Sequence, residues 1–229
     1  MEYHQLIVAV QKHQSIPKGK ITSIKMRTII IVLLASMYFL PVHSQNVISQ
    51  DQSKDSLKTK LKILFMKDQF FRKMYKDVEE QYGSTSHETE YFWEVVEKQD
   101  QILEKELIAI LEQYGWLGIT EVGRLGNTAQ WAILQHASVA TKQKYAPLLK
   151  ASVLEKESQA QHYARLIDRM LINQGEAQRY GSQITYDDSG NKIFYEIQEP
   201  GSVNQRRAAI GLSSIQDFAK KVGVEWKEN

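Results

Sequence analysis

The sequence predicts a mainly α-helical fold with about four longer helices, one β-hairpin near the C-terminus and two short terminal helices. Three observations support this. After residue 54, apolar residues recur at helical spacing over most of the chain. Glycine clusters separate several of these stretches, and one late segment is instead rich in Ile, Thr, Tyr and Phe on both sides of a turn.

The first two helices are predicted over Asp55–Gln81 and His87–Tyr114, where apolar residues fall near one face. Between them, Ser86 or Thr85 is suited to cap the second helix, because a hydroxyl accepts a hydrogen bond from an exposed backbone N–H. Gly115 is suited to end it, since glycine adopts the left-handed conformation at low cost.

Two more helices are predicted over Asn127–Thr141 and Gln143–Gln174, after a glycine-containing loop. Pro147 is tolerated in the first turn of a helix, so the fourth helix is expected to begin just before it.

The C-terminal part changes character. Ser182–Tyr186 and Lys192–Ile197 have strand-like composition, and the turn-forming run Asp187–Asn191 lies between them. These segments predict a β-hairpin. Two short helices are predicted after it, over Asn204–Ile210 and Ser213–Val222.

The N-terminal part carries an export pattern. Arg27 precedes a mainly apolar run of 12 residues, Ile29–Leu40, and Val42 and Ser44 occupy the −3 and −1 positions of a cleavage site. The run is shorter than the roughly 20 residues that span a bilayer. The sequence therefore predicts an exported protein, periplasmic or secreted, with no stable membrane anchor after cleavage; the alternative is a signal anchor that is never cleaved.

The predicted organisation has four parts. Residues 1–25 form an N-terminal extension upstream of Met26, the expected true start, and residues 26–44 form the signal peptide. Residues 45–54 are a polar lead-in, and residues 55–229 form a single helical domain, a length suited to one core.

Charge and composition exclude several classes of function. Residues 1–44 hold five of the 29 Lys and Arg and one of the 27 Asp and Glu, so the remaining chain has 24 bases, 26 acids and a net charge of −2. A nucleic-acid partner is therefore not expected. The chain has no cysteine, which excludes thiolate metal sites and cysteine nucleophiles. No sequence pattern indicates a metal or a cofactor: Asp187–Asn191 lacks the alternating acids and later Glu of a calcium loop.

His136 is the candidate catalytic residue. It follows Ala129, Ala132 and Ile133 on a predicted apolar stripe, where a half-buried imidazole can act as a general base. The alternative is a core histidine whose ring nitrogens are satisfied by neighbours.

The remaining candidates are binding residues. Asp68 and Arg72 are four residues apart on the first helix and can pair there. Arginines such as Arg206 and Arg207 can clamp a carboxylate or phosphate, or can instead pair with buried acids. The other members, which lie around the junction between helix and hairpin, are Asp168, Arg169, Gln178, Tyr180 and Gln183. The four tryptophans are interpreted as core anchors.

Taken in order, short motifs resemble an uncharacterised bacterial family of domains of unknown function. The matching elements are Asp68-Gln69 with Arg72, Tyr114-Gly115-Trp116, Gly123, Trp131 with Gln135-His136-Ala137, Asp168-Arg169, Gln178, Tyr180-Gly181-Ser182-Gln183, Arg206-Arg207 and Gly211-Leu212. The likeness covers about residues 61–218. The family pattern has proline where this chain has Leu117. The resemblance implies candidate residues and no reaction.

Two hypotheses follow. The first is a small-ligand binding module that takes a polar or anionic ligand at a site around His136 and Arg206/Arg207. The alternative interpretation of this site is a hydrolase-like enzyme with His136 as general base. The second is a structural or interaction protein in which the same residues form a buried ion-pair network. Membrane association through the first helix is not favoured, because its lysines are interspersed with acids.

Overall fold

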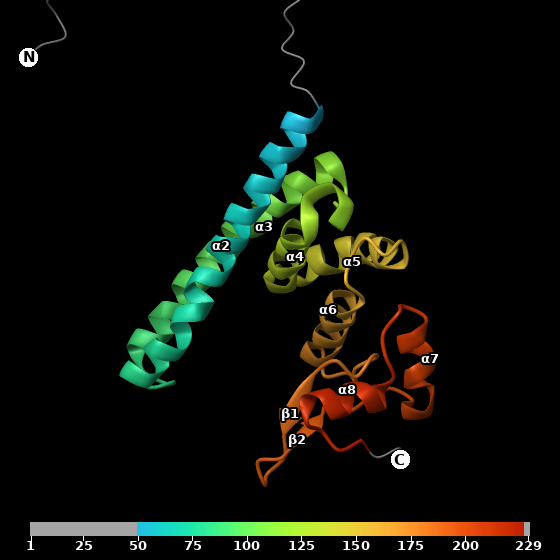
Figure 1. The fold of residues 1–229 in the computed structure, drawn as a ribbon. Helices are drawn as coiled ribbons and strands as arrows, with labels where there is room; N and C mark the ends of the chain where they lie inside the picture. Colours follow the sequence, from blue (N-terminus) through green and yellow to red (C-terminus); the bar gives the residue numbers. More distant parts are fainter. Residues whose placement is uncertain (1–49, 227–229) are drawn as a thin grey trace, which may run out of the picture. The chain divides into compact units, whose positions relative to one another are not determined.

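Two long helices that lie side by side open the part of the chain described by the computed structural model, residues 50–226 (Figure 1). They are α2, Gln50–Tyr82, and α3, His87–Tyr114. Both predicted caps of α3 are confirmed. The Ser86 hydroxyl accepts from the backbone N–H of Thr89 at 3.1 Å, and Gly115 ends the helix with a φ of +71°.

The third helix, α4, spans Ile119–His136 and packs against α2 and α3. It starts earlier than predicted, because carboxylates satisfy its exposed N–H groups. The Glu121 side chain accepts from Gly118 N, and Glu157 accepts from Thr120 N, both at 2.8 Å. Gly123, with a φ of +74°, bends the helix within the segment predicted as a loop.

The predicted fourth helix is two helices, α5, Val139–Leu154, and α6, Ala160–Asn173. Lys156, with a φ of +64°, turns the chain between them, and the next two backbone N–H groups both donate to the Ser152 carbonyl. The expected position of Pro147 in a first turn was wrong. Ser138 caps α5 by accepting from Thr141 N, so Pro147 is the ninth residue of the helix.

The predicted hairpin and the short helices after it are confirmed. Strands β1, Ile184–Tyr186, and β2, Lys192–Phe194, pair antiparallel with Thr185 opposite Ile193. The chain continues through a 3-10 turn at Pro200–Ser202 into α7, Val203–Ala208, and α8, Ile215–Val222.

Buried apolar side chains form two clusters within the described residues. The larger lies mainly among α2 to α6, extends to Tyr180 and Ile210, and includes Leu61, Leu107, Ile133, Leu149 and Leu166. The smaller has Ile197, Val203 and Ile215 at its centre. Of the four tryptophans, three pack against these clusters, whereas Trp93 is 39% exposed and is not a core anchor.

The predicted extension, signal peptide and start of the polar lead-in lie outside the described residues. Helix α2 already includes Gln50, within the segment expected to be the lead-in. None of the helices in residues 50–226 combines the length and apolarity needed to cross a bilayer.

Candidate functional site

Arg72 joins residues from three helices into one polar cluster, which we call the His136 cluster: Asp68, Arg72, Asp100 and His136. Its guanidinium donates through Nη2 to both carboxylate oxygens of Asp100, at 2.9 and 2.7 Å. Nη1 donates to the backbone carbonyl of Asp68 at 2.8 Å, and Nε donates to Nε2 of His136 at 3.1 Å. The predicted pairing of Asp68 with Arg72 is present, at 3.4 Å between Oδ1 and Nη1.

His136 closes α4 and is partly buried beside Arg72. An arginine N–H can only donate, so Nε2 of His136 is the acceptor and the proton of the neutral ring is on Nδ1. Burial, with the positive charges of Arg72, Arg169 and Lys142, lowers the pKa of His136 to about 3. The ring is therefore neutral at pH 7 and presents an N–H donor.

Asp68 is almost fully buried on α2. Its Oδ2 accepts from Gln69 at 2.7 Å, whereas Oδ1 has no hydrogen bond and is held only by the longer ion pair to Arg72. Burial raises the pKa of Asp68 because desolvation outweighs the attraction of Arg72.

Two cations from other helices lie around His136. Arg169 is exposed on α6, and Lys142 is partly buried on α5. Burial and the charge of Arg169 lower the pKa of Lys142. Neither side chain makes a hydrogen bond or ion pair within residues 50–226. The nearby Glu104 is occupied, since its two oxygens accept from the backbone N–H and the hydroxyl of Ser138 at 3.1 and 2.7 Å.

The other predicted residues form a second group around the segment 178–183. Asp168 is buried, and its carboxylate accepts three backbone N–H groups, from Arg179, Tyr180 and Ser182, at 2.8 to 2.9 Å. This geometry anchors the segment to α6. It leaves Asp168 no free side for a ligand.

Arg207, also buried, ties α7 to two neighbours. It donates to the carbonyls of Tyr180 and Ser213, both at 2.7 Å, and its guanidinium lies 5.1 Å from the Phe218 ring. Burial lowers the pKa of Arg207, and the charge of Asp168 opposes this effect.

Gln178 joins the hairpin to the same segment. Its amide accepts from Gln183 N and donates to the carbonyls of Gln183 and Tyr195. The Gln183 side chain reaches only the Arg165 carbonyl and the Ser182 hydroxyl, both at 3.4 Å. The side chains of Asp168, Arg207 and Gln178 thus form their hydrogen bonds with backbone groups.

Arg206 and Tyr180 border a hollow of about 380 Å³ between α5 and α7, together with the exposed cations Lys150 and Arg179. Arg206 itself donates to the carbonyls of Arg179 and Gln198 and lies 3.8 Å from Glu199. Buried Tyr180 packs edge-to-face on Tyr163, with ring centroids 6.0 Å apart.

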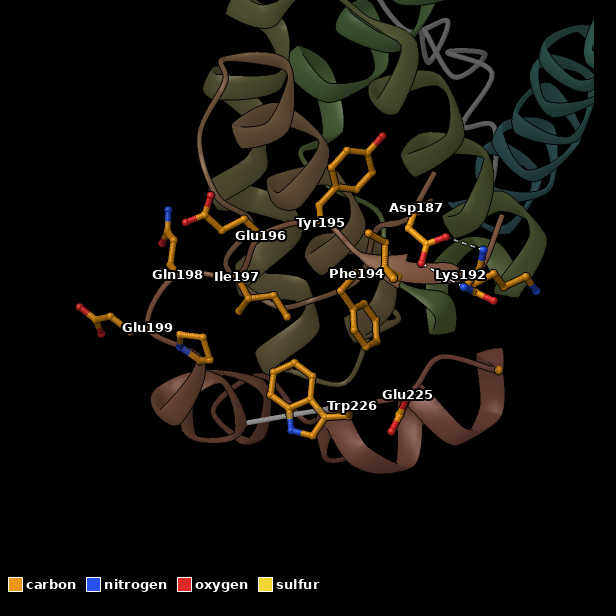
Figure 2. Close-up of a pocket in the computed structure, with 14 residues that line it drawn as sticks. Asp187, Lys192, Phe194, Tyr195, Glu196, Ile197, Gln198, Glu199, Glu225 and Trp226 are labelled. Carbon is orange, nitrogen blue, oxygen red and sulfur yellow. Dashed lines mark hydrogen bonds between the residues drawn. The ribbon is translucent and has the colours of Figure 1, made fainter. Parts of the chain in front are cut away.

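A hollow of about 1040 Å³ contains none of the predicted site residues (Figure 2). It is lined by the hairpin and the C-terminal segment, and Figure 2 shows Trp226 facing Phe194 across it, with ring centroids 6.0 Å apart. Size alone does not identify a site here. Asp187, whose pKa is lowered by hydrogen bonds from Asn191, lines this hollow, but its carboxylate is occupied within the hairpin turn by Ser189 and Asn191.

The predicted single site is therefore two groups. No hydrogen bond or ion pair in residues 50–226 links the His136 cluster to Asp168, Gln178, Arg206 or Arg207. Arg169 lies near His136, although its neighbour Asp168 belongs to the other group. In the described part of the chain, no three His, Asp or Glu side chains are placed to hold a metal ion.

Sequence reasoning missed Asp100 and Lys142. Asp100 is 28 residues from Arg72 and meets it only because α3 folds back along α2. It also missed a buried network in which Gln130 accepts from the Leu117 N–H and donates to its carbonyl, at 3.0 and 2.9 Å. A proline at 117, as in the family pattern, has no N–H for the first of these bonds.

Residues 57–225 match a family described as a family of unknown function, DUF6624. The chain belongs to this family. The match covers most of the helical domain and confirms the resemblance to a domain of unknown function. No curated protein and no solved structure matches the chain.

Proposed function

We propose that this member of the DUF6624 family is an exported domain that binds a small anion beside His136. The observation that supports the proposal most is that the acids around this ring are hydrogen-bonded by the protein, whereas, in the described part of the chain, two of the cations around it are not. The acids Asp68, Asp100 and Glu104 accept hydrogen bonds from protein donors. The cations Arg169 and Lys142 make no hydrogen bond or ion pair within residues 50–226, and the charge of Glu104 offsets only part of that of Lys142.

The chemistry of His136 fits a donor better than a general base. Its Nε2 lone pair accepts the Arg72 N–H, and three positive charges disfavour protonation. The Nδ1–H group can donate to a carboxylate or phosphate oxygen while Arg169 and Lys142 supply charge. Hydrogen bonds to a charged group contribute about 1.5–3 kcal/mol each.

Export is supported by the sequence pattern of residues 26–44, which lie outside the described part. A mass measurement of the N-terminus of the protein recovered from its host tests this. An N-terminus at Gln45 supports export with cleavage, and one that still includes Ile29–Leu40 contradicts cleavage.

The contacts of Asp168, Gln178 and Arg207 support the structural role for those three residues. The two roles thus divide between the two groups: anion binding at the His136 cluster and structural support around segment 178–183.

The test is an NMR titration of histidine-labelled full-length protein with inorganic phosphate and, separately, with acetate. We expect a saturable shift of the His136 ring signals with at least one anion. Bound negative charge also raises the pKa of His136 above about 3, so the ring protonates at a higher pH in the complex.

Arg169→Gln is the decisive variant, and Arg165→Gln is its matched control. Both arginines are exposed on α6, one turn apart, but only Arg169 acts on the pKa of His136. We expect Arg169→Gln to weaken binding about 10- to 100-fold, from the loss of one charge-assisted contact. Equal weakening in both variants, or no saturable shift of His136 with either anion, contradicts the proposal.

A further inference from the structure

An apolar ridge runs along the outer face of α2. Ile63, Met66, Phe70 and Met74 are 48%, 70%, 59% and 42% exposed, respectively. Their spacing of three or four residues places them on one side of the helix, opposite the buried Leu61 and Leu64. Exposed large apolar side chains in a continuous row mark an interaction surface more often than isolated ones do.

The unpaired charges that flank this ridge are positive. Between Lys58 and Lys76 the helix carries six lysines and one acid, Asp68, which is buried against Arg72. Three of these lysines, Lys58, Lys60 and Lys76, form ion pairs with Asp55, Glu106 and Glu80. The sequence-based expectation that acids offset the lysines of this helix therefore holds for these three, whereas the lysines beside the ridge are not paired in the described part of the chain. Lys62, Lys67 and Lys73 make no ion pair within residues 50–226.

From these two observations we infer that the α2 ridge binds the surface of an anionic lipid bilayer. At about 100° per residue, Lys62 and Lys73 lie on one flank of the ridge and Lys67 on the other. This is the pattern of a helix that lies in the membrane interface, with apolar side chains towards the acyl chains and lysines reaching the headgroups.

A second copy of the chain is a poorer occupant of this surface. A two-fold contact brings the same patch of each copy together, so it places the unpaired Lys62, Lys67 and Lys73 of one copy against those of the other. The exposed acids of α2 lie outside this stretch, at Asp55 and from Asp77 onwards. The anionic bilayer satisfies both the apolar ridge and its flanking charges.

The absence of cysteine allows a local test with the full chain. Met66→Cys is labelled with an environment-sensitive dye and mixed with vesicles of phosphatidylglycerol or phosphatidylcholine. We expect a blue shift of the dye with phosphatidylglycerol only, which weakens with added salt. Ser189→Cys, at the exposed hairpin turn, is the control and should show no shift, because the dye reports only its own surroundings.

Replacing Lys62, Lys67 and Lys73 by Gln in the Met66→Cys chain should weaken vesicle binding about 100-fold, since each surface lysine contributes about fivefold. Three results overturn the inference. They are no shift with phosphatidylglycerol, an equal shift with phosphatidylcholine, and a shift that rises with protein concentration in the absence of vesicles, which indicates self-association.

Discussion

At the scale of single residues, the protonation of His136 follows from its surroundings. Desolvation penalises the imidazolium, and Arg72 both repels it and occupies the Nε2 lone pair. This differs from a surface histidine, which titrates near pH 6.5. The same contacts that disfavour a general base leave one ring N–H as a donor.

This state of His136 predicts a pH dependence of stability. The unfolded chain binds a proton on this histidine as pH falls below about 6.5, whereas the folded chain does so only near pH 3. The contribution of His136 to stability is therefore complete above pH 6.5 and is lost as pH falls towards 3. Between pH 7 and pH 5 the free energy of unfolding of the wild type should fall by about 2 kcal/mol more than that of His136→Gln. Glutamine is chosen because its amide oxygen can still accept the hydrogen bond from Arg72.

Urea unfolding of both proteins at pH 7 and pH 5 measures this difference. Burial also lowers the pKa of His162, to about 4, so this residue also loses stabilisation as pH falls. Because both proteins contain His162, its effect cancels in the difference between them. Parallel losses of stability in the two proteins would contradict the assigned pKa of His136.

The sequence could indicate the right residue types but not their grouping. The spacing of Asp68 and Arg72 on one helix was enough to predict their pairing, because it depends on helix geometry alone. The contacts of Arg72 with Asp100 and His136 depend on how α2, α3 and α4 pack, which no local pattern contains. Asp168 and Arg169 belong to different groups because neighbouring residues on a helix point about 100° apart. Which group each one joins depends again on how the helices pack.

At the scale of the elements, hydrophobic spacing and caps predicted α2, α3, the hairpin and both terminal helices close to their observed bounds. The break between α5 and α6 was missed because it contains neither glycine nor proline. It depends on left-handed Lys156 and on the Ser152 carbonyl, which accepts two N–H groups. The early start of α4 depends on Glu157, a distant residue that caps it.

Pro147 leads to a prediction for α5. As the ninth residue of this helix it cannot donate to the preceding turn, and a proline inside a helix costs up to about 3 kcal/mol relative to alanine. Because Pro147 is exposed, Pro147→Ala loses little packing and should raise the free energy of unfolding by about 1–3 kcal/mol. Urea unfolding tests this, with Lys150→Ala as the control at an exposed site of the same helix, expected within about 0.5 kcal/mol of wild type. A destabilised Pro147→Ala protein would show that the ring relieves strain in α5.

At the scale of the whole domain, stability is unevenly distributed over residues 50–226. The larger apolar cluster draws on five helices, whereas the smaller one has three buried residues at its centre. So small a core cannot fold by itself. The hairpin, α7 and α8 therefore depend on contacts to the rest of the domain. Tyr180 and Ile210 provide apolar contacts to the larger cluster, and the buried side chains of Asp168, Gln178 and Arg207 provide polar ones.

This dependence predicts a local response to the loss of Arg207. Arg207→Ala removes the donors to the Tyr180 and Ser213 carbonyls and leaves buried Asp168 without its nearby positive charge, a change that costs about 3–5 kcal/mol. Amide hydrogen exchange over residues 178–224 should accelerate at least about 100-fold, while exchange in α3 stays as in the wild type. Arg179→Ala is the control, because that arginine is in the same segment but its exposed side chain donates no hydrogen bond within residues 50–226. Uniform acceleration over all helices would instead mean that the two apolar clusters unfold as one unit, and that Arg207 supports the whole domain.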